Sequence, residues 1–313
     1  ADTFFVDAFD IVDGGTAYDK VKTNDASGIA IDMTGWVSVE SVSGFTGDDV
    51  IDGSSQTTQI LFLGKAGADT MTGGSANDVL IGNEGDDVLN GSGGNDTMLG
   101  GSGADSFTGG EGNDLFYIED STDVVVDGGT GTDKIVVNNA AGVTLTTASF
   151  AGVEVVKGFT GADSIDASDE VVGIQLKGNA GADTLTGGSG NDLVNGGGDG
   201  DFLFGNGGGD VLLGKGGNDR LDGGAGSDFL KGDAGADVFV FDDGSGNDTI
   251  GDYTDGVDSF DFAAHSQVNS LGDLDLRVVT GGAEMEILAS GEVITLTGAD
   301  FNDLDSSDFV FSI

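Results

Sequence analysis

The chain has 313 residues, 60 of them glycine, and it contains neither proline nor cysteine. Ten Lys and Arg residues stand against 56 Asp and Glu residues, and the resulting net charge of −46 disfavours nucleic acid and anionic membrane surfaces as partners. Without cysteine there are no disulfides or thiolate metal sites, and no apolar run reaches the roughly 18 residues of a membrane-spanning helix, so no membrane insertion is expected.

Residues 1–63 are predicted to form an irregular β flank. Short runs such as 37–42 alternate β-branched and polar residues, as half-buried strands do. Two nine-residue segments within the flank begin at Gly14 and Gly44 and carry aspartate at their sixth position. Their other positions are degenerate, so the flank is expected to be less regular than residues 64–117.

Residues 64–117 form six consecutive nine-residue units, of which the first reads GKAGADTMT. Column one is always glycine, column six is always aspartate and column eight is always apolar. Glycines in columns one, two and four are expected to let the backbone take positive φ and turn within six residues. Columns seven to nine are then expected to form a short strand whose column-eight side chain points into the core.

The same register returns after a second irregular β flank, residues 118–177. Seven units fill residues 178–240, and the first of them reads GNAGADTLT. The whole pattern repeats at a constant shift of 114 residues, so that Asp13 falls on Asp127 and Gly44 falls on Gly158. Some units depart from the pattern: glycine is replaced in column four by Ala76 and Asp199, and in column two by Lys65, Lys215 and Asp233.

The duplication predicts two tandem modules, residues 1–117 and 118–240, followed by a C-terminal cap, residues 241–313. Alternating residues at 284–287 and 293–296 predict strands in the cap. No stretch shows helical periodicity, because glycine every few residues costs a helix about 1 kcal/mol each time. Two nine-residue units would make one full coil, with successive coils stacked roughly 4.8 Å apart, so an all-β fold is predicted.

Stacked coils would bring the column-six carboxylates close to one another. Like charges about 4–5 Å apart repel by roughly 1 kcal/mol in water and by more in a less polar environment. Calcium resolves this conflict, because it accepts six to eight oxygen ligands and combines carboxylates with the backbone carbonyls of glycine turns. Magnesium is the weaker candidate, because it holds its water and requires stricter octahedral geometry.

These nine-residue units resemble the GGxGxDxUx motif of the RTX (repeats-in-toxin) family, a nonapeptide that binds calcium in a parallel β-helix. The resemblance implies a parallel β-roll with several Ca²⁺ ions between adjacent turns, ligated by column-six aspartates and turn carbonyls. The predicted calcium-site aspartates are Asp69, Asp78, Asp87, Asp96, Asp105, Asp114, Asp183, Asp192, Asp201, Asp210, Asp219, Asp228 and Asp237. The column-one glycines of the same predicted sites are Gly64, Gly73, Gly82, Gly91, Gly100, Gly109, Gly178, Gly187, Gly196, Gly205, Gly214, Gly223 and Gly232.

The resemblance further implies export by a type I secretion machinery that reads an uncleaved C-terminal signal, and residues 308–313 are similar to the acidic-then-apolar tails of such substrates. One hypothesis is therefore a secreted, extracellular or cell-surface structural protein that folds on binding calcium. It would serve in a surface layer, through self-assembly or contact with cell-surface polysaccharide, or as an adhesive segment. The alternative is the C-terminal calcium-binding and secretion module of a larger RTX toxin, protease or lipase, which the lack of an initiator methionine favours.

Catalytic interpretations of the sequence are weaker. Residues 209–216 match GxxxxGK but lack the Ser or Thr that should come after the lysine. His265 is the only histidine, which excludes an HExxH zinc site, and it is expected to be a solvated residue of the cap. The many carboxylates recur as equivalents rather than as an acid and a base in different environments, so no enzymatic activity is predicted.

Overall fold

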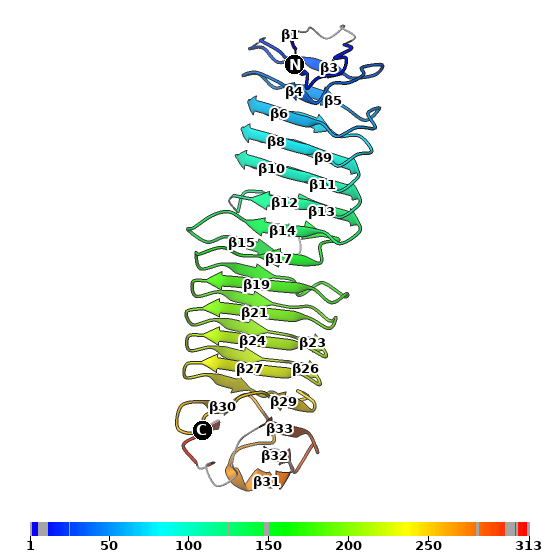
Figure 1. Ribbon diagram of the computed structural model, residues 1–313. Helices are drawn as coiled ribbons and strands as arrows, with labels where there is room; N and C mark the ends of the chain where they lie inside the picture. Colours follow the sequence, from blue (N-terminus) through cyan, green and yellow to red (C-terminus); the bar gives the residue numbers. More distant parts are fainter. Residues whose placement is uncertain are drawn as a thin grey trace. The chain divides into compact units, whose positions relative to one another are not determined.

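The structure is a computed structural model that describes residues 2–5, 12–24, 26–119, 121–123, 125–146, 150–279, 282–297, 304 and 306–311. The chain packs as two compact units, the first comprising residues 1–139 and 148–156 and the second comprising residues 140–147 and 157–313. Among the described residues the only helix is a single 3-10 turn, η2 (Leu271–Asp273). All other regular elements of the described residues are β-strands, which confirms the predicted all-β fold class (Figure 1).

The first unit is a solenoid built from two parallel sheets, because each coil supplies one strand to each sheet. One sheet consists of β1 (Thr3–Phe5), β2 (Lys20–Lys22), β4 (Ser41–Ser43), β6 (Leu61–Ala66), β8 (Val79–Glu84), β10 (Thr97–Ser102), β12 (Leu115–Ile118) and β14 (Lys134–Val137). The other consists of β3 (Ala30–Asp32), β5 (Val50–Asp52), β7 (Thr70–Thr72), β9 (Val88–Gly93), β11 (Ser106–Glu111), β13 (Val125–Thr130) and β16 (Phe150–Ala151).

The second unit repeats this arrangement. One of its sheets contains β19 (Gln175–Ala180), β21 (Leu193–Gly198), β24 (Val211–Gly216), β27 (Phe229–Ala234) and β29 (Asp248–Ile250). The other contains β15 (Thr144–Thr146), β18 (Ser164–Asp166), β20 (Thr184–Thr186), β22 (Phe202–Phe204), β25 (Arg220–Asp222), β28 (Val238–Val240), β30 (Ser259–Phe262) and β34 (Phe309–Phe311). A two-stranded pair is formed by β23 (Gly207–Gly208) and β26 (Ala225–Gly226), and β17 (Val155–Lys157) has residues in both units.

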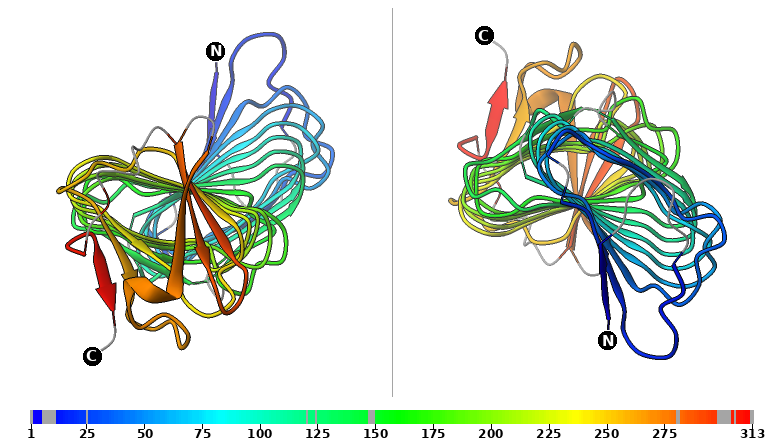
Figure 2. Two further views of the ribbon diagram at one scale, coloured as in Figure 1. Left: turned by 90° about the horizontal axis from the view of Figure 1, so that it is seen from below. Right: turned by 90° about the horizontal axis from the view of Figure 1, so that it is seen from above.

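The register of the strands confirms that two nine-residue units make one coil. Leu61 lies opposite Val79 and Leu193 lies opposite Val211, a shift of 18 residues in each case. In the end-on views, successive coils of each unit lie one behind another, each turned slightly from the one before (Figure 2). The flanks continue the same sheets with longer coils, since Ser41 pairs with Leu61 at a shift of 20 residues. The predicted irregularity of the flanks therefore lies in their turns.

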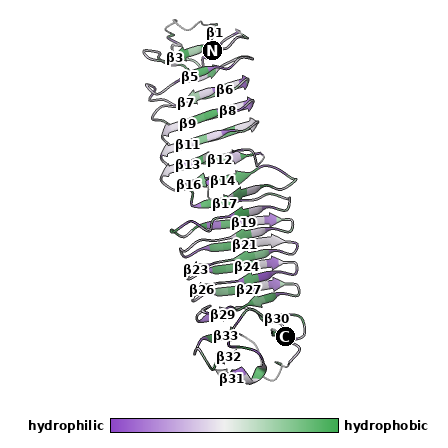
Figure 3. Ribbon diagram, turned by 180° about the vertical axis from the view of Figure 1, so that it is seen from behind, coloured by the Kyte–Doolittle hydropathy of each residue, from purple (hydrophilic) through white to green (hydrophobic). Residues whose placement is uncertain are grey.

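The core is a thin layer between the two sheets of each unit, and it is filled by column eight. All thirteen column-eight side chains are fully buried. In Figure 3, where the ribbon is coloured by hydropathy, the green of hydrophobic residues is found on the strands. Phe107 of β11 and Phe116 of β12 meet edge to face across this layer, with ring centroids 6.0 Å apart. The alternation of buried and less buried residues along each strand follows directly from the two-residue period of a strand.

The C-terminal part of the second unit closes with an antiparallel ribbon and an aromatic cluster. The ribbon is formed by β31 (Leu274–Val279), β32 (Gly282–Ile287) and β33 (Val293–Thr297), and the predicted strands at 284–287 and 293–296 lie within it. Phe309 of β34 stacks on Phe260 of β30, with ring centroids 5.4 Å apart. Of the predicted tail signal, Ser312 and Ile313 lie outside the described residues.

The prediction that His265 is solvated is wrong. The residue is 2% exposed, and its Nδ1 atom lies 3.1 Å from Asp243 Oδ1 while its Nε2 atom lies 3.4 Å from Glu292 Oε2. The imidazole is buried because it bridges two loops that are distant in the sequence, which sequence periodicity does not report. The division of the chain into residues 1–117, 118–240 and 241–313 describes its duplication and stays a prediction.

Candidate metal centre

The column-six aspartates lie at the ends of the turns, immediately before each short strand. All thirteen are buried, with exposed fractions of 3% or less. Burial follows from the geometry of the repeat, because the aspartate lies two positions before the column-eight core residue and so points to the same side of the chain. A buried carboxylate requires hydrogen-bond donors or a cation to offset the loss of water.

One oxygen of each carboxylate is satisfied by the neighbouring coil. The Oδ1 atom of Asp87 accepts the backbone N–H of Asp69 at 2.7 Å, and the Oδ1 atom of Asp105 accepts that of Asp87 at 2.8 Å. The pattern continues along both sides of each unit, and we call each such series an aspartate ladder. The first unit contains the ladders Asp49–Asp69–Asp87–Asp105–Asp123 and Asp78–Asp96–Asp114–Asp133. The second unit contains Asp163–Asp183–Asp201–Asp219–Asp237–Asp258 and Asp192–Asp210–Asp228–Asp248.

The second oxygen of most ladder carboxylates has no hydrogen-bond donor. These Oδ2 atoms are buried, so water does not reach them. A buried anionic oxygen without a donor is costly in a folded protein, and a cation is the usual remedy. The ladder residues with such an Oδ2 atom are Asp69, Asp87, Asp96, Asp114, Asp133, Asp183, Asp201, Asp210, Asp219, Asp228 and Asp237.

The electrostatics of the ladders agree with this interpretation. Burial raises the pKa of Asp87 and Asp96 to about 7, and repulsion from neighbouring ladder aspartates adds a smaller upward shift. Burial likewise raises the pKa of Asp183 and Asp201 to about 7. Desolvation is thus the larger cause, and the repulsion between like charges that the sequence predicts is the smaller one.

The prediction that column-one glycines take positive φ is wrong. None of the thirteen has positive φ, and close approach of other atoms requires glycine there instead. A Cβ atom on Gly64 would collide with Asp69 Oδ2 and would lie 2.9 Å from the carbonyl oxygen of Gly82. Column one is therefore the place where the donor-free Oδ2 atom and a carbonyl oxygen of the next coil converge.

Positive φ occurs in columns two and four. In column two it is tolerated by several residues other than glycine, including Lys65 (φ 103°), Asn83 (φ 86°) and Lys215 (φ 83°). Asp199 in column four also has positive φ (74°), and its carboxylate accepts the backbone N–H of Gly181 at 3.2 Å. That side chain is thus bonded to the preceding coil.

Several ladder residues escaped the sequence analysis. Asp49, Asp133 and Asp163 belong to the ladders, and the signal that could have found them was the sixth-position aspartate of the isolated nine-residue units in the flanks. A second ladder runs through column five, where the Asn95 N–H donates to Asn77 Oδ1 at 2.8 Å and the Asn113 N–H donates to Asn95 Oδ1 at 2.7 Å. Column five alternates among Asn, Asp and other residues, which concealed its role.

The described residues hold no group of three or more His, Asp or Glu side chains that could bind a metal ion by themselves. Each turn of the regular arrays offers one buried carboxylate, so a bound cation needs further oxygen ligands, which the backbone carbonyls of the turn can supply. An all-oxygen donor set of this kind suits a hard divalent cation, and the absence of a rigid octahedral carboxylate cage favours calcium over magnesium.

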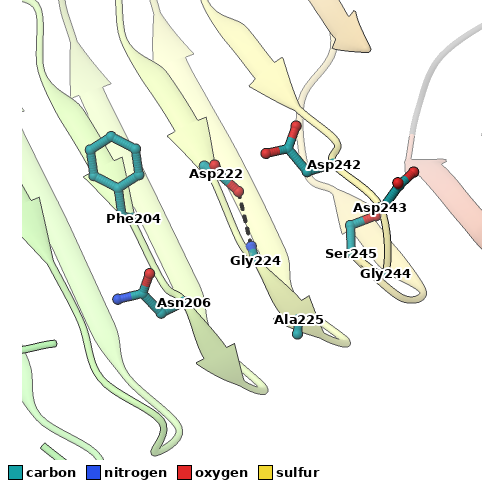
Figure 4. Close-up of a pocket in the computed structure, with 9 residues that line it drawn as sticks. All are labelled: Phe204, Asn206, Asp222, Gly224, Ala225, Asp242, Asp243, Gly244 and Ser245. Atoms are coloured by element: carbon teal, nitrogen blue, oxygen red, sulfur yellow. Dashed lines mark hydrogen bonds between the residues drawn. The ribbon is translucent and has the colours of Figure 1, made fainter. Parts of the chain in front are cut away.

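A separate cavity of about 210 Å³ in the second unit is a weaker candidate (Figure 4). Asp222, Asp242 and Asp243 line it, and burial together with the nearby Asp242 carboxylate raises the pKa of Asp222. However, Asp222 already accepts the Gly224 N–H at 3.1 Å, and Asp243 accepts the Ser266 N–H at 2.8 Å. Two of its three carboxylates thus have protein donors, unlike the ladder Oδ2 atoms.

Stacked parallel coils whose turns present buried, donor-free carboxylate oxygens define a calcium-binding β-solenoid. Comparison with protein families gives the same result: the model of the RTX calcium-binding nonapeptide repeat matches residues 63–98, 90–125, 175–203 and 204–239. The chain therefore carries RTX calcium-binding nonapeptide repeats in both arrays, as the sequence pattern predicts. A search of curated protein sequences found no match.

Two solved structures illustrate the similarity. The AlgE6R3 subunit of the Azotobacter vinelandii mannuronan C5-epimerase is 25% identical, over 51% of this chain and 80% of that chain, with a TM-score of 0.28. The extracellular lipase LipA from Serratia marcescens is 16% identical over 82% of this chain, with a TM-score of 0.33. The match spans 40% of the lipase chain. At these TM-scores neither likeness bears on the activity of this protein.

Proposed function

We propose that the protein is a secreted structural protein whose β-roll folds when it binds several calcium ions outside the cell. The buried, donor-free Oδ2 atoms of the aspartate ladders carry this proposal. In it, the column-six aspartates with donor-free Oδ2 atoms and the carbonyl oxygens beside the column-one glycines hold calcium, which supplies the positive charge that the buried carboxylates lack. The repeats themselves are structural and calcium-binding elements, and RTX repeat proteins are typically secreted.

Binding and folding are coupled in this proposal. Calcium stabilises the folded chain by mass action, because the ligand carbonyls and carboxylates are brought together only in the coil. In a cytosol with little calcium the acidic chain stays unfolded, and it folds where calcium is abundant. Among the described residues there is no helix of the length and apolarity needed to cross a membrane.

Export by a type I machinery fits the same scheme. In the folded protein residues 309–311 pair with β30 and Phe309 is 7% exposed, so a machinery that reads this segment must meet it before folding. Outside the cell, the roll would serve in a surface layer or other surface assembly, through self-assembly or contact with polysaccharide, or in adhesion. The alternative, a calcium-binding module of a larger toxin, protease or lipase, uses the same sites, and the length of the reading frame distinguishes the two.

The test is far-ultraviolet circular dichroism of the chain with a chelator and then with millimolar calcium chloride. We expect an unfolded spectrum with the chelator and a β spectrum with calcium. An identical β spectrum under both conditions, together with no bound calcium in equilibrium dialysis, would overturn the proposal.

A further inference from the structure

The turns before the column-six aspartates differ in how they treat the Oδ2 atom. In the turn of residues 73–78, the N–H of Gly74 donates to Asp78 Oδ2 at 2.7 Å, and in the turn of residues 187–192 the N–H of Gly188 donates to Asp192 Oδ2 at 2.7 Å. We call such a turn closed. Turns whose aspartate keeps a buried Oδ2 atom without a donor are called open.

The backbone supports this division independently of the hydrogen bond. Column two has positive φ in open turns, as at Asn206 (70°) and Gly224 (77°), but neither Gly74 nor Gly188 has positive φ. Column four behaves in the same way, with positive φ at Gly208 and Gly226 but not at Gly190. A closed turn therefore has a different peptide arrangement, in which a column-two N–H points at the carboxylate.

The closed turns share a position next to an irregular coil. The N–H of Ser75 donates to the carbonyl of Gln56, and the N–H of Ser189 donates to the carbonyl of Glu170, as the N–H of Gly93 does to the carbonyl of Gly74 in an open turn. Both partners belong to loops of the preceding coil that lack the nine-residue pattern. Within the two regular arrays these closed turns are the first repeat turns on their sides of the units, and they lie 114 residues apart, at equivalent places in the duplication. The same contact closes the flank turns ending at Asp49 and Asp163, where Phe45 and Phe159 donate to the Oδ2 atom.

Outside the matched repeats, the turn of residues 128–133 is open. Gly129 (φ 92°) and Gly131 (φ 143°) have positive φ in columns two and four, and Asp133 is fully buried with a donor-free Oδ2 atom. A Cβ atom on Gly128 would lie 2.7 Å from that Oδ2 atom and would collide with the carbonyl oxygen of Gly152. The same convergence of oxygens marks the open turns of the regular arrays.

We infer that calcium binding is confined to open turns: the turns ending at Asp78 and Asp192 are closed by their own backbone and bind none, whereas the turn ending at Asp133 binds calcium. The inference rests on the proposed function, since it concerns the same cation. A backbone N–H that donates to the Oδ2 atom already satisfies this buried oxygen, so no cation is needed there. The partial positive charge of the N–H hydrogen also repels a cation at that position. The inference differs from the sequence prediction, which includes Asp78 and Asp192 among the calcium ligands and does not include Asp133.

The experiment counts calcium ions per chain at saturating calcium, by equilibrium dialysis and metal analysis, for Asp192→Asn, Asp210→Asn and Asp133→Asn. Asp210 is the matched control, because it comes after Asp192 on the same ladder. We expect a loss of about one ion per chain for Asp210→Asn and for Asp133→Asn, and no loss for Asp192→Asn, because each open turn contributes one carboxylate. Asp192→Asn should instead lower only the denaturant midpoint, since an amide accepts one backbone N–H fewer.

An equal loss in Asp192→Asn and Asp210→Asn, or an unchanged count in Asp133→Asn, would overturn the inference. Absence of calcium binding by the unmodified chain would instead overturn the proposed function, so the two failures are distinguishable. Asp78→Asn against Asp96→Asn repeats the comparison in the first unit, in case a variant of the second unit fails to fold. The circular dichroism spectrum at saturating calcium shows which variants are folded.

Discussion

At the scale of single residues, the aspartate ladder joins a structural role to a ligand role within one side chain. The Oδ1 atom ties one coil to the previous one through a backbone N–H, as between Asp201 and Asp183. The Oδ2 atom of the same carboxylate stays donor-free and faces column one. Replacing the aspartate thus removes a coil-to-coil bond as well as a proposed calcium ligand.

The raised pKa values predict opposite pH dependences for the metal-free and the calcium-bound protein. Burial raises the pKa of Asp87, Asp96 and Asp210 to about 7, whereas the usual value is 3.8. Between these values the metal-free fold binds more protons than the unfolded chain, so its stability falls as the pH rises from about 4 to about 7. We therefore expect the chelated chain to gain β structure when acidified from pH 8 to pH 5, as circular dichroism would show.

Calcium reverses this dependence, because it binds the deprotonated carboxylates. The apparent calcium affinity should rise as the pH increases from 5 to 8, and a titration followed by circular dichroism at each pH measures it. Sedimentation at the same concentrations controls for precipitation near the isoelectric point of about 4.1. A chelated chain that gains structure with rising pH would contradict the assignment of the ladders as buried and donor-free.

At the scale of elements, the sequence predicted the strands better than the turns. Column eight identified the core because, in an extended chain, residues that alternate between apolar and polar place the apolar side chains on one face. Leu89 and Leu212 are fully buried as expected. The turns could not be read so directly. A glycine column that recurs in every repeat has several possible causes, and only the positions of Gly82 and Asp69 show that crowding, not φ, acts at Gly64.

The distinction between closed and open turns was beyond the sequence for a related reason. Closed turns of the regular arrays come directly after an irregular coil, as residues 73–78 come after the loop that contains Gln56, and nothing within residues 73–78 records that neighbour. The ladder position of Asp133 was likewise obscured, because its unit, GGTGTDKIV, stands alone outside the uninterrupted register of the two arrays although it matches their defining columns. The carboxylate columns themselves were evident, since aspartate recurs there without exception in the regular arrays.

Crowding at column one predicts a contrast within a single turn. Alanine at Gly91 would place a Cβ atom against Asp96 Oδ2 and 2.8 Å from the Gly109 carbonyl oxygen, whereas the nearest atom to a Cβ on Gly93 is 3.9 Å away. Neither glycine has positive φ. We expect Gly91→Ala to lower the free energy of unfolding at saturating calcium by about 1–3 kcal/mol, because the turn must shift, and to raise the calcium concentration needed for folding.

Gly93→Ala is the matched control, and we expect it to change the free energy of unfolding by less than about 0.5 kcal/mol. Urea denaturation in saturating calcium measures the free energy of unfolding of both variants. Gly214→Ala against Gly216→Ala repeats the pair in the second unit, where the atom nearest to a Cβ on Gly216 would be 3.8 Å away. Equal effects of the two substitutions would show that column-one glycine is not held by crowding.

At the scale of the whole molecule, the net charge of −46 acts on the chain in two different ways. The exposed carboxylates repel one another through solvent, and salt screens this repulsion over about 8 Å at physiological ionic strength. The ladder carboxylates are buried, so mobile ions cannot approach them without entering the turn. Screening and ligation are therefore separable, and only ligation satisfies the donor-free oxygens.

This separation predicts ion specificity in folding. Sodium chloride at the ionic strength of the calcium buffer should compact the chelated chain without producing a β spectrum, since a monovalent ion screens exposed charge but is a poor partner for a buried carboxylate. Magnesium should act in the same way at equal concentration, because it retains its water where turn carbonyls would have to replace it. Small-angle scattering should give a radius of gyration below the roughly 60 Å of an unfolded chain of this length in sodium or magnesium, and a further decrease only in calcium. The β spectrum should appear with that last decrease. If magnesium or sodium produced the full β spectrum, charge neutralisation alone would be enough to close the coils, and the donor-free oxygens would not select calcium.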